Sequence, residues 1–349
     1  MEMFYKIKAL AEAGTKITLH YFDYKRERNT NGLEQYCEKI IAYKRKPVLN
    51  AATFSKPHIV ASRINKQLIE QLNTDDHPIL LEGIHGTGII PFLKNRHRKI
   101  AVRLHNDEAV YYRHLAKTET NFFKKSYYAI ESFLLKQHQQ TLPQQALCLA
   151  ITTADANAFK ATYRLNHVFV LPPFLPWQQV SSQPGSGTYC LYHGNMSVAE
   201  NEATAIWLIQ QVFSTSLVPF VIAGKNISKT LQKAAAPFQN IRLQSNPAED
   251  ELNELIQQAH IHVVPDFNAT GVKLKLLHAL FCGRFCITNS RAVACNSTIA
   301  FAKTPQDYMG FIKSFINQRF SEAAVAEREG ALRHYNNYEN ARLLSAYLS

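Results

Sequence analysis

The sequence predicts an α/β protein of two domains, each built on a parallel sheet. Its 349 residues exceed the usual span of one hydrophobic core. Short apolar strands alternate with amphipathic helices along most of the chain, which is typical of right-handed β-α-β units. A segment rich in proline and glycine, residues 173–188, interrupts this alternation and predicts a linker. We expect an N-terminal domain at 1–172, a C-terminal domain at 189–318, and helices at 319–349 that pack back on the first domain.

The second half shows the alternation most clearly. Its strands are short and continuously apolar, as expected where helices cover both faces of a sheet. Ser228 is a good N-cap residue for one of the helices between them. The expected strands are Tyr189–Asn195, Val218–Lys225, Ile241–Ser245, Ile261–Asp266 and Phe285–Asn289. The expected helices are Glu200–Phe213, Ser228–Ala235, Glu249–Gln258, Gly271–Cys282 and Pro305–Ile316.

The first half repeats this rhythm less regularly. It opens on a helix, Met3–Ala13, without the strand and glycine-rich turn that usually begin such a domain, so its first strand is either upstream or absent. A long helical region rich in Tyr, Phe and Lys runs from Glu108 to about Gln140. A shorter helix is expected at Ser62–Leu72. The expected strands are Lys16–Tyr24, Lys39–Tyr43, Ile79–Ile84, Lys99–His105, Ala146–Thr152 and His167–Leu171.

Composition and charge narrow the classes of protein. Hydrophobic residues make up 46% and charged residues 19%, which indicates an ordinary globular chain. No apolar run is long enough for a spanning helix, and the first residues lack a secretory signal core. The six cysteines form no CxxC pair, which indicates reduced thiols and a cytoplasmic location.

The positive charge is concentrated in the first half. Residues 1–172 carry 25 Lys and Arg against 15 Asp and Glu, whereas 173–349 are nearly neutral. A basic half predicts contact with something anionic, and the candidates are an anionic membrane surface at the inner face of the cell membrane, a phosphate-bearing acceptor, or nucleic acid. A basic surface that serves only solubility is an equally good interpretation.

The clearest local signal for a binding site is the segment from Pro265 to Leu280. A strand ends at Asp266, a polar loop follows, and a helix starts near Thr270 or Gly271. Free backbone N–H groups at a helix start attract phosphate, and glycine permits close approach. The residues expected to bind an anionic donor here are Thr270, Gly271, Val272, Lys273 and Lys275, with His278 two turns further along the same face.

Other candidate residues follow strands, where ligands of open α/β sheets bind. In the second half, Gly194, Asn195 and Lys225 end two strands. In the first half, His105 with Glu108, and His85, end two others, and we expect them to serve in acid–base chemistry or to bind sugar hydroxyls. Two domains joined by a hinge would present these strand ends to a shared cleft. A metal site is a competing interpretation, but no histidine and carboxylate pattern has ligand spacing. His260 and His262 lie at the start of a strand, and we interpret them as structural.

Four segments resemble the GT-B glycosyltransferases, in particular the family-four-like bacterial enzymes that build surface polysaccharides. They are Arg103–Asn106 with the long Tyr-rich helix and Glu131, Ile151–Asp155, Tyr192–Ser197 with Glu200–Glu202, and Gly271–Leu280 with Gly283. The resemblance covers nearly the whole chain, and the last segment is the most specific.

The resemblance implies two Rossmann-like domains and transfer of a sugar from a nucleotide-sugar donor to a saccharide or lipid-linked acceptor. It implies retention of anomeric configuration, no required metal or other cofactor, and a role in surface polysaccharide or lipopolysaccharide assembly. By position, His105 matches the histidine that contacts the donor sugar. Gly271 and Lys275 match the start of the diphosphate-binding helix.

The sequence also departs from the family. Thr270 and His278 stand where the family commonly has two glutamates, and Asn195 and Asn201 lie near the positions of a basic pair. Lys225 or Lys273 could supply that charge. Three other functions therefore remain open: a non-catalytic carbohydrate- or partner-binding relative, a nucleotide-sugar epimerase, and nucleic-acid binding through the basic half. No recognisable nucleic-acid module supports the last of these.

Overall fold

The computed structural model describes residues 2–23, 32–46, 55–142, 146–267, 273–290 and 296–349. The chain forms two compact units. Unit 1 comprises residues up to Pro176 together with Tyr335–Ser349, and unit 2 comprises Trp177–Ala269 and Lys273–His334. The boundary lies within the segment expected as a linker. Within the described residues, no helix combines the length and apolar character needed to cross a bilayer.

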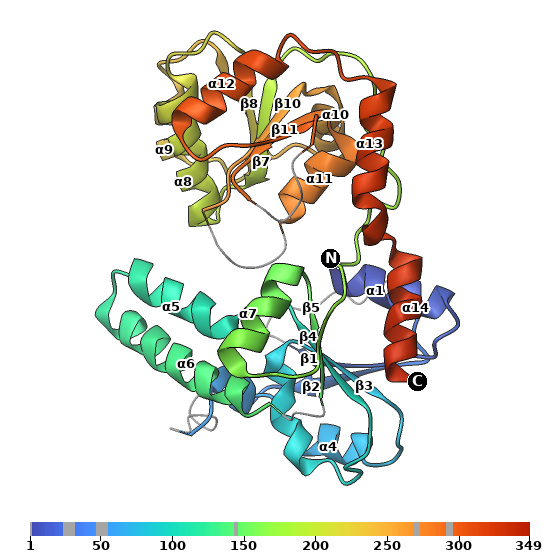
Figure 1. Cartoon of the computed structure of the whole chain (residues 1–349). Coiled ribbons are helices and arrows are strands. Elements are labelled where there is room, and N and C mark those ends of the chain that lie inside the picture. Colours follow the sequence, from blue (N-terminus) through green and yellow to red (C-terminus); the bar gives the residue numbers. More distant parts are fainter. Residues whose placement is uncertain (1, 24–31, 47–54, 143–145, 268–272, 291–295) are drawn as a thin grey trace. The chain divides into compact units, whose positions relative to one another are not determined.

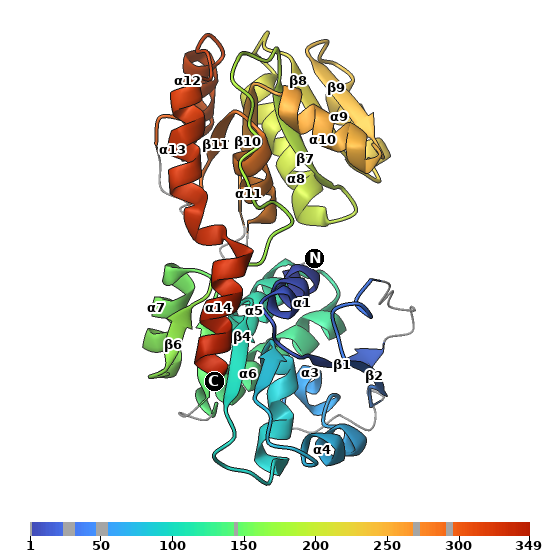
Figure 2. The ribbon, with the colours of Figure 1, turned by 90° about the vertical axis from the view of Figure 1, so that its right-hand side faces the viewer.

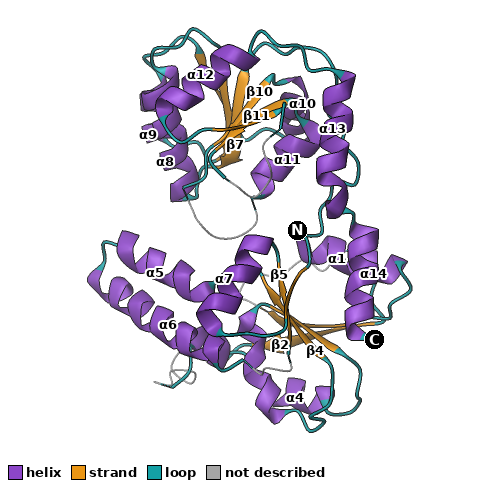
Figure 3. Ribbon diagram, in the orientation of Figure 1, coloured by secondary structure: helices purple, strands orange, loops and turns teal. Residues whose placement is uncertain are grey.

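Unit 2 is a six-stranded parallel sheet with helices on both faces (Figures 1 and 3). The strand order is β12-β11-β10-β7-β8-β9. The five expected strands are present, and the short β12 is an addition that the sequence did not predict. The strands are β7 (Cys190–Asn195), β8 (Phe220–Lys225), β9 (Ile241–Ser245), β10 (Ile261–Val264), β11 (Phe285–Thr288) and β12 (Ile299–Phe301).

The helices of unit 2 follow the strands in alternation and bury apolar residues against the sheet. Ser228 caps α9, because its side chain accepts a hydrogen bond from the backbone N–H of Leu231 at 3.1 Å. The helices are α8 (Ala199–Leu208), the π-helical turn η2 (Ile209–Phe213), α9 (Lys229–Ala235), α10 (Glu249–Gln258), α11 (Leu274–Cys282), α12 (Pro305–Phe315) and α13 (Glu322–Leu332).

Unit 1 contains a four-stranded parallel sheet in the order β3-β4-β5-β6, and β1 and β2 pair separately as a two-stranded parallel sheet. The chain opens on α1, as expected. The first two predicted strands, β1 and β2, lie outside the four-stranded sheet. The strands are β1 (Thr18–Asp23), β2 (Lys39–Lys44), β3 (Ile79–Glu82), β4 (Ile100–Leu104), β5 (Leu147–Ala150) and β6 (Val168–Val170).

The long helical region of unit 1 is a hairpin of two helices, α5 and α6. Asn121 is the N-cap of the second helix, because its side chain accepts a hydrogen bond from the backbone N–H of Lys124 at 3.1 Å. The helices of unit 1 are α1 (Glu2–Glu12), α3 (His58–Ala61), α4 (Lys66–Leu72), the 3-10 segment η1 (Ile84–Phe92), α5 (Glu108–Thr118), α6 (Phe122–Gln140), α7 (Thr153–Tyr163) and α14 (Asn337–Leu348). The short 3-10 turn η3 (Arg333–Tyr335) spans the point in the sequence where unit 2 ends and unit 1 resumes.

The chain's last helix, α14, packs beside α1 within unit 1, as Figures 1 and 2 both show. Ala341 and Leu344 are fully buried there against Leu149 and Leu171. The Asn337 side chain accepts from the backbone N–H of Leu175 at 2.9 Å and donates to its carbonyl at 2.8 Å. Of the closing segment, α14 therefore belongs to unit 1, whereas α13 belongs to unit 2.

Candidate functional site

In unit 2, the carboxyl ends of β7 and β8 approach each other closely. Gly194 pairs with Gly224, and Asn195 pairs with the exposed Lys225. A Cβ on Gly224 would lie 1.8 Å from the carbonyl oxygen of Gly194, so only glycine fits at this position. The two backbones can therefore come together at the edge where ligands of parallel sheets bind.

Lys275 lies beside this strand end. A Cβ built on Gly194 would lie 3.5 Å from its Nζ. The Nζ donates to Asn201 Oδ1 at 2.7 Å and to the Tyr192 hydroxyl at 3.1 Å, and it lies 4.8 Å from the centre of the Tyr192 ring. Burial lowers the pKa of Lys275 to about 8, and the charge of Lys273 adds to this effect against the opposing charges of Asp266 and Glu200. A partly buried ammonium with a lowered pKa next to a glycine edge is suited to receive an anion.

Lys273 has a different environment from Lys275. It is the N-cap residue of α11, which begins at Leu274, and its Nζ forms an ion pair with Asp266 at 2.7 Å. The structure therefore couples Lys273 to the end of β10. Thr270, Gly271 and Val272, the remaining residues of the expected phosphate seat, lie outside the described residues.

His278 stacks on Trp177, with ring centroids 4.2 Å apart and an interplanar angle of 21°. Its ring also meets His193 edge-on at 5.5 Å. Burial lowers the pKa of His278 to about 4, so the imidazole is neutral at physiological pH. Its Nε2 has no hydrogen-bond partner among the described residues. A neutral ring nitrogen backed by an aromatic platform can hydrogen-bond a hydroxyl.

Trp177 and His193 build the surroundings of His278. The sequence interpretation missed Trp177, and it quoted His193 only as part of the Tyr192–Ser197 motif. Trp177 lies at the end of a proline-rich stretch with no periodicity, and only its chemical type could have drawn attention to it. Asn201 and Tyr192 were quoted as part of a motif, but their contact with Lys275 depends on the fold of α8 and β7. His260 and His262 are fully buried, and each shares a hydrogen bond with a backbone carbonyl, which confirms that they are structural.

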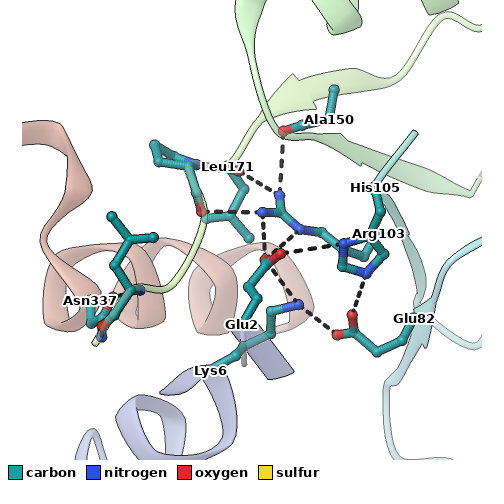
Figure 4. A network of polar contacts seen from close by, with 10 residues as sticks. Glu2, Lys6, Glu82, Arg103, His105, Ala150, Leu171 and Asn337 are labelled. Atoms are coloured by element: carbon teal, nitrogen blue, oxygen red, sulfur yellow. Dashed lines mark hydrogen bonds and ion pairs between the residues drawn. The ribbon is translucent and has the colours of Figure 1, made fainter. Parts of the chain in front are cut away.

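In unit 1, five charged side chains form a network at the carboxyl ends of β3 and β4 (Figure 4). Arg103 is fully buried, and its Nη2 donates to Glu2 at 2.7 Å. Lys6, 1% exposed, donates to Glu82 at 2.7 Å. His105 lies between the two carboxylates, with Nε2 2.9 Å from Glu82 and Nδ1 3.3 Å from Glu2. The network ties α1 to the sheet.

This network sets the charge of His105. Burial alone lowers the pKa of an imidazole, but the hydrogen bonds to Glu2 and Glu82 outweigh burial and raise the pKa of His105. For the carboxyl group of Glu82, burial alone would raise the pKa, but the charge of Lys6 and the contact with His105 lower it to about 2. In this arrangement both ring nitrogens of His105 face carboxylates. The residue therefore supplies positive charge, and it has no ring nitrogen left to act as a base.

His85 and Glu108 form a second, separate pair. The distance from His85 Nε2 to Glu108 Oε1 is 3.6 Å. Glu108 is the first residue of α5, where a carboxylate suits the helix dipole. The structure thus brings His85 to Glu108, and it brings His105 to Glu2 and Glu82. Glu2 and Lys6 were missed by sequence reasoning, and their only signal was a Glu–Lys pair four residues apart on the opening helix.

In the described part of the chain, no group of three or more His, Cys, Asp or Glu side chains could hold a metal ion.

Unit 2 contains most of the segment that matches a known protein family. Residues 187–313 match the family model described as glycosyl transferases group 1. A protein from Klebsiella pneumoniae, described as an uncharacterized 44.6 kDa protein in the cps region, is 26% identical over 269 residues, which are 70% of this chain and 66% of that protein.

Solved structures share the fold at low sequence identity. HepE from Anabaena in complex with UDP aligns over 99% of this chain and 95% of its own, with a TM-score of 0.66 and 11% identity. TarM aligns over 83% of this chain but only 57% of its own, with a TM-score of 0.56 and 12% identity. These findings confirm the expected resemblance and the GT-B fold of two Rossmann-like units.

Proposed function

Because residues 187–313 match the family model described as glycosyl transferases group 1, we propose that this protein transfers a sugar from a nucleotide-sugar donor to a saccharide or lipid-linked acceptor. The expected enzyme class, a glycosyltransferase, is supported by the family match and the fold together. The relative from a cps region supports a role in surface polysaccharide assembly. We propose retention of anomeric configuration from the family resemblance.

The observation that carries this proposal is the position of Lys275. Its ammonium lies beside Gly194, where a Cβ would meet Asn201 Nδ2 at 3.4 Å and Lys275 Nζ at 3.5 Å, so glycine lets the ammonium come close to the strand end. Among the described residues, its hydrogen-bond partners Asn201 and Tyr192 are neutral, so a diphosphate would bring a full negative charge into direct contact with it. Loss of the nucleoside diphosphate leaves negative charge on the departing phosphate. A preorganised cation at that position stabilises the transition state more than the ground state.

We propose that His278 binds the nucleotide. Its neutral Nε2 is suited to a hydrogen bond with a ribose hydroxyl, and stacking on Trp177 fixes the plane of the ring. HepE was crystallised with UDP and glucose, which makes UDP the first nucleotide to test. The neighbouring His193 is also kept neutral, since burial and the nearby His278 and His262 lower its pKa. The rings of Trp177, His193 and His278 are thus uncharged and suit a nucleoside, while Lys275 suits the diphosphate.

We propose that unit 1 binds the acceptor. Its candidate groups are the cation at His105, held by Glu2 and Glu82, and the pair of His85 with Glu108. Transfer is proposed to need no metal, because Lys275 supplies the charge that a metal would otherwise bring to the leaving phosphate. Chelation with EDTA is expected to leave the rate of transfer unchanged. A rate that falls and then recovers with added Mg²⁺ or Mn²⁺ would refute this part.

Calorimetric titration with UDP, GDP, ADP and CMP tests the proposal. One nucleotide is expected to bind, and Lys275→Ala is expected to weaken its binding at least about tenfold, as for the loss of a charged hydrogen bond. Lys313→Ala is a matched control, because Lys313 is an exposed lysine on α12 in the same unit. Failure of every nucleotide to bind, or equal binding by Lys275→Ala, would overturn the proposal.

A binding protein without catalysis is the second candidate. It is favoured by one observation: His278 stands where the family commonly has a glutamate, and its low pKa leaves it uncharged. Such a protein would bind the nucleotide with the same dependence on Lys275 but release no nucleoside diphosphate from a nucleotide sugar. Incubation of the purified protein with UDP-sugars and analysis of the products distinguishes the two functions.

A further inference from the structure

Helix α6 carries an unusual stripe of exposed apolar side chains. The exposed fractions are 74% for Phe122, 82% for Phe123, 41% for Tyr127, 57% for Ile130 and 60% for Phe133. With about 100° between successive residues of a helix, these five side chains fall within an arc of about 140°. They therefore form one continuous face, which we call the α6 stripe.

The α6 stripe is additional to the face that α6 buries. On its other side the helix packs Leu134 and Leu135 into unit 1, and Ser132 donates to the carbonyl of Ala109 on α5 at 2.8 Å. The helix is held in place by that buried face, so the α6 stripe contributes nothing to the core of unit 1. A contiguous apolar surface of this kind on a folded protein indicates a surface that meets an apolar partner.

The exposed charges on the helices of the hairpin are basic, and the acidic Glu119 in the connection between α5 and α6 is half-buried. Within α5 and α6, every exposed charged residue is basic: Arg113, Lys117, Lys124, Lys125 and Lys136. The carboxylates of the two helices are not exposed on the surface, because Glu131 is buried and Glu108 is partly buried beside His85. Lys125 and Lys136 lie within about 60° of one edge of the stripe on the helical wheel. Aromatic rings next to lysines are the pattern by which surface helices enter the interface of an anionic bilayer.

We propose that the α5–α6 hairpin docks on an anionic lipid bilayer, with Phe122, Phe123 and Ile130 inserted below the headgroups and the lysines in contact with them. Burial of one exposed phenylalanine strengthens partitioning at least about tenfold. Each lysine near a surface rich in acidic lipid contributes on the order of fivefold. The three apolar side chains and the lysines together should therefore give a higher membrane affinity than either the apolar contacts or the charge contacts alone.

The hairpin projects at the margin of unit 1, and α5 and α6 lie side by side there (Figure 1). The inference deepens the proposed function, since it names the surface on which a lipid-linked acceptor would be met. Its test needs neither donor nor acceptor, so its failure would leave the proposed function untouched.

Co-sedimentation of the full chain with vesicles tests the inference. One set contains phosphatidylcholine alone, and the other contains phosphatidylcholine with about a third of phosphatidylglycerol. We expect binding to the anionic vesicles that weakens as NaCl is raised from 0.05 to about 0.5 M, because salt screens the lysine contacts. Binding to the neutral vesicles is expected to be at least about tenfold weaker.

Variants assign the binding to the α6 stripe. Phe123→Ser with Ile130→Ser is expected to weaken binding at least about tenfold, and Lys124→Gln with Lys125→Gln at least about tenfold at low salt. Leu217→Ser is the matched control, because Leu217 is 95% exposed in unit 2 and outside the hairpin. All of these side chains are exposed, so the variants should fold, and circular dichroism checks this. The inference is overturned if the wild-type protein does not bind anionic vesicles, if the serine variant binds as well as Leu217→Ser, or if the stripe instead joins two copies of the chain in analytical ultracentrifugation.

Discussion

Binding of a nucleoside diphosphate should weaken steeply between pH 7 and pH 9, because Lys275 loses its charge in this range. Its pKa is lowered from the usual value of 10.5 to about 8, mainly by burial. An anion next to the Nζ stabilises the protonated form, so binding favours protonation, and by linkage protonation favours binding. Affinity is therefore almost fully present at pH 7 and is lost as the pH rises through about 8.

The size of the effect follows from the fraction of protein that carries the ammonium. With a pKa of about 8, roughly nine tenths of the Lys275 side chains are protonated at pH 7 and roughly one tenth at pH 9. If only the protonated form binds, the dissociation constant rises about tenfold, which corresponds to about 1.4 kcal/mol. The nucleotide contributes little to this change, since the second ionisation of a phosphate monoester lies near pH 6 and is almost complete at pH 7.

Calorimetry with UDP at pH 7, 8 and 9 measures this dependence, and two variants locate it. Lys275→Arg keeps its charge throughout and should show no slope over this range. His105→Gln should retain the slope, which separates Lys275 from the histidine in unit 1 whose pKa is raised. A dissociation constant for the wild-type protein that stays constant from pH 7 to pH 9 would refute the reasoning.

Three further predictions concern stability. Gly224→Ala should lower the free energy of unfolding by at least about 2 kcal/mol, since its Cβ would lie 1.8 Å from the Gly194 oxygen. Gly330→Ala should raise the free energy of unfolding by about 0.5–1 kcal/mol, because Gly330 lies on α13 with open space around it. Urea denaturation of both variants measures the two changes. Glu82→Gln should cost about 2–3 kcal/mol, because it removes a charged partner of the buried Lys6. The wild-type protein should lose the stability contributed by Glu82 as the pH falls from about 4.5 towards 2, since its pKa is lowered to about 2 in the folded state. Thermal melts across this range should show a smaller loss in Glu82→Gln, which keeps the carboxylate of Glu2, whose pKa is also lowered.

The sequence predicted the sheet of unit 2 well because each strand is a continuous apolar run between helices with clear starts. The expected strand at Ile241–Ser245 has the observed bounds, and the strand expected at Tyr189–Asn195 begins one residue later as β7. Strand β12 was missed because Ile299–Phe301 is only three residues long and pairs at the sheet edge with β11. Its short pattern cannot be distinguished from a loop.

The candidate site was predictable only where its residues share a strand end or one face of a helix. Gly194, Lys225 and Lys275 were found in this way. The contacts of Lys275 with Tyr192 and Asn201 were not, because they join residues 83 and 74 positions apart. Periodicity and local motifs carry no information at such separations.

The surroundings of His105 show the same limit more strongly. The sequence predicted a histidine available for acid–base chemistry or sugar binding. The fold places it between Glu2, which lies on the opening helix, and Glu82 from β3. Only the packing of α1 against the ends of β3 and β4 brings these side chains together, and that packing follows from tertiary structure. The charge state of His105 therefore could not be read from its local sequence.

The position of a bound nucleotide tests the account most directly. A crystal structure of the protein soaked with UDP is predicted to show the diphosphate beside Gly194, within hydrogen-bonding distance of Lys275 Nζ, and the ribose next to His278. A nucleotide bound in well-defined density elsewhere, with Lys275 still engaged only by Tyr192 and Asn201, would contradict the account.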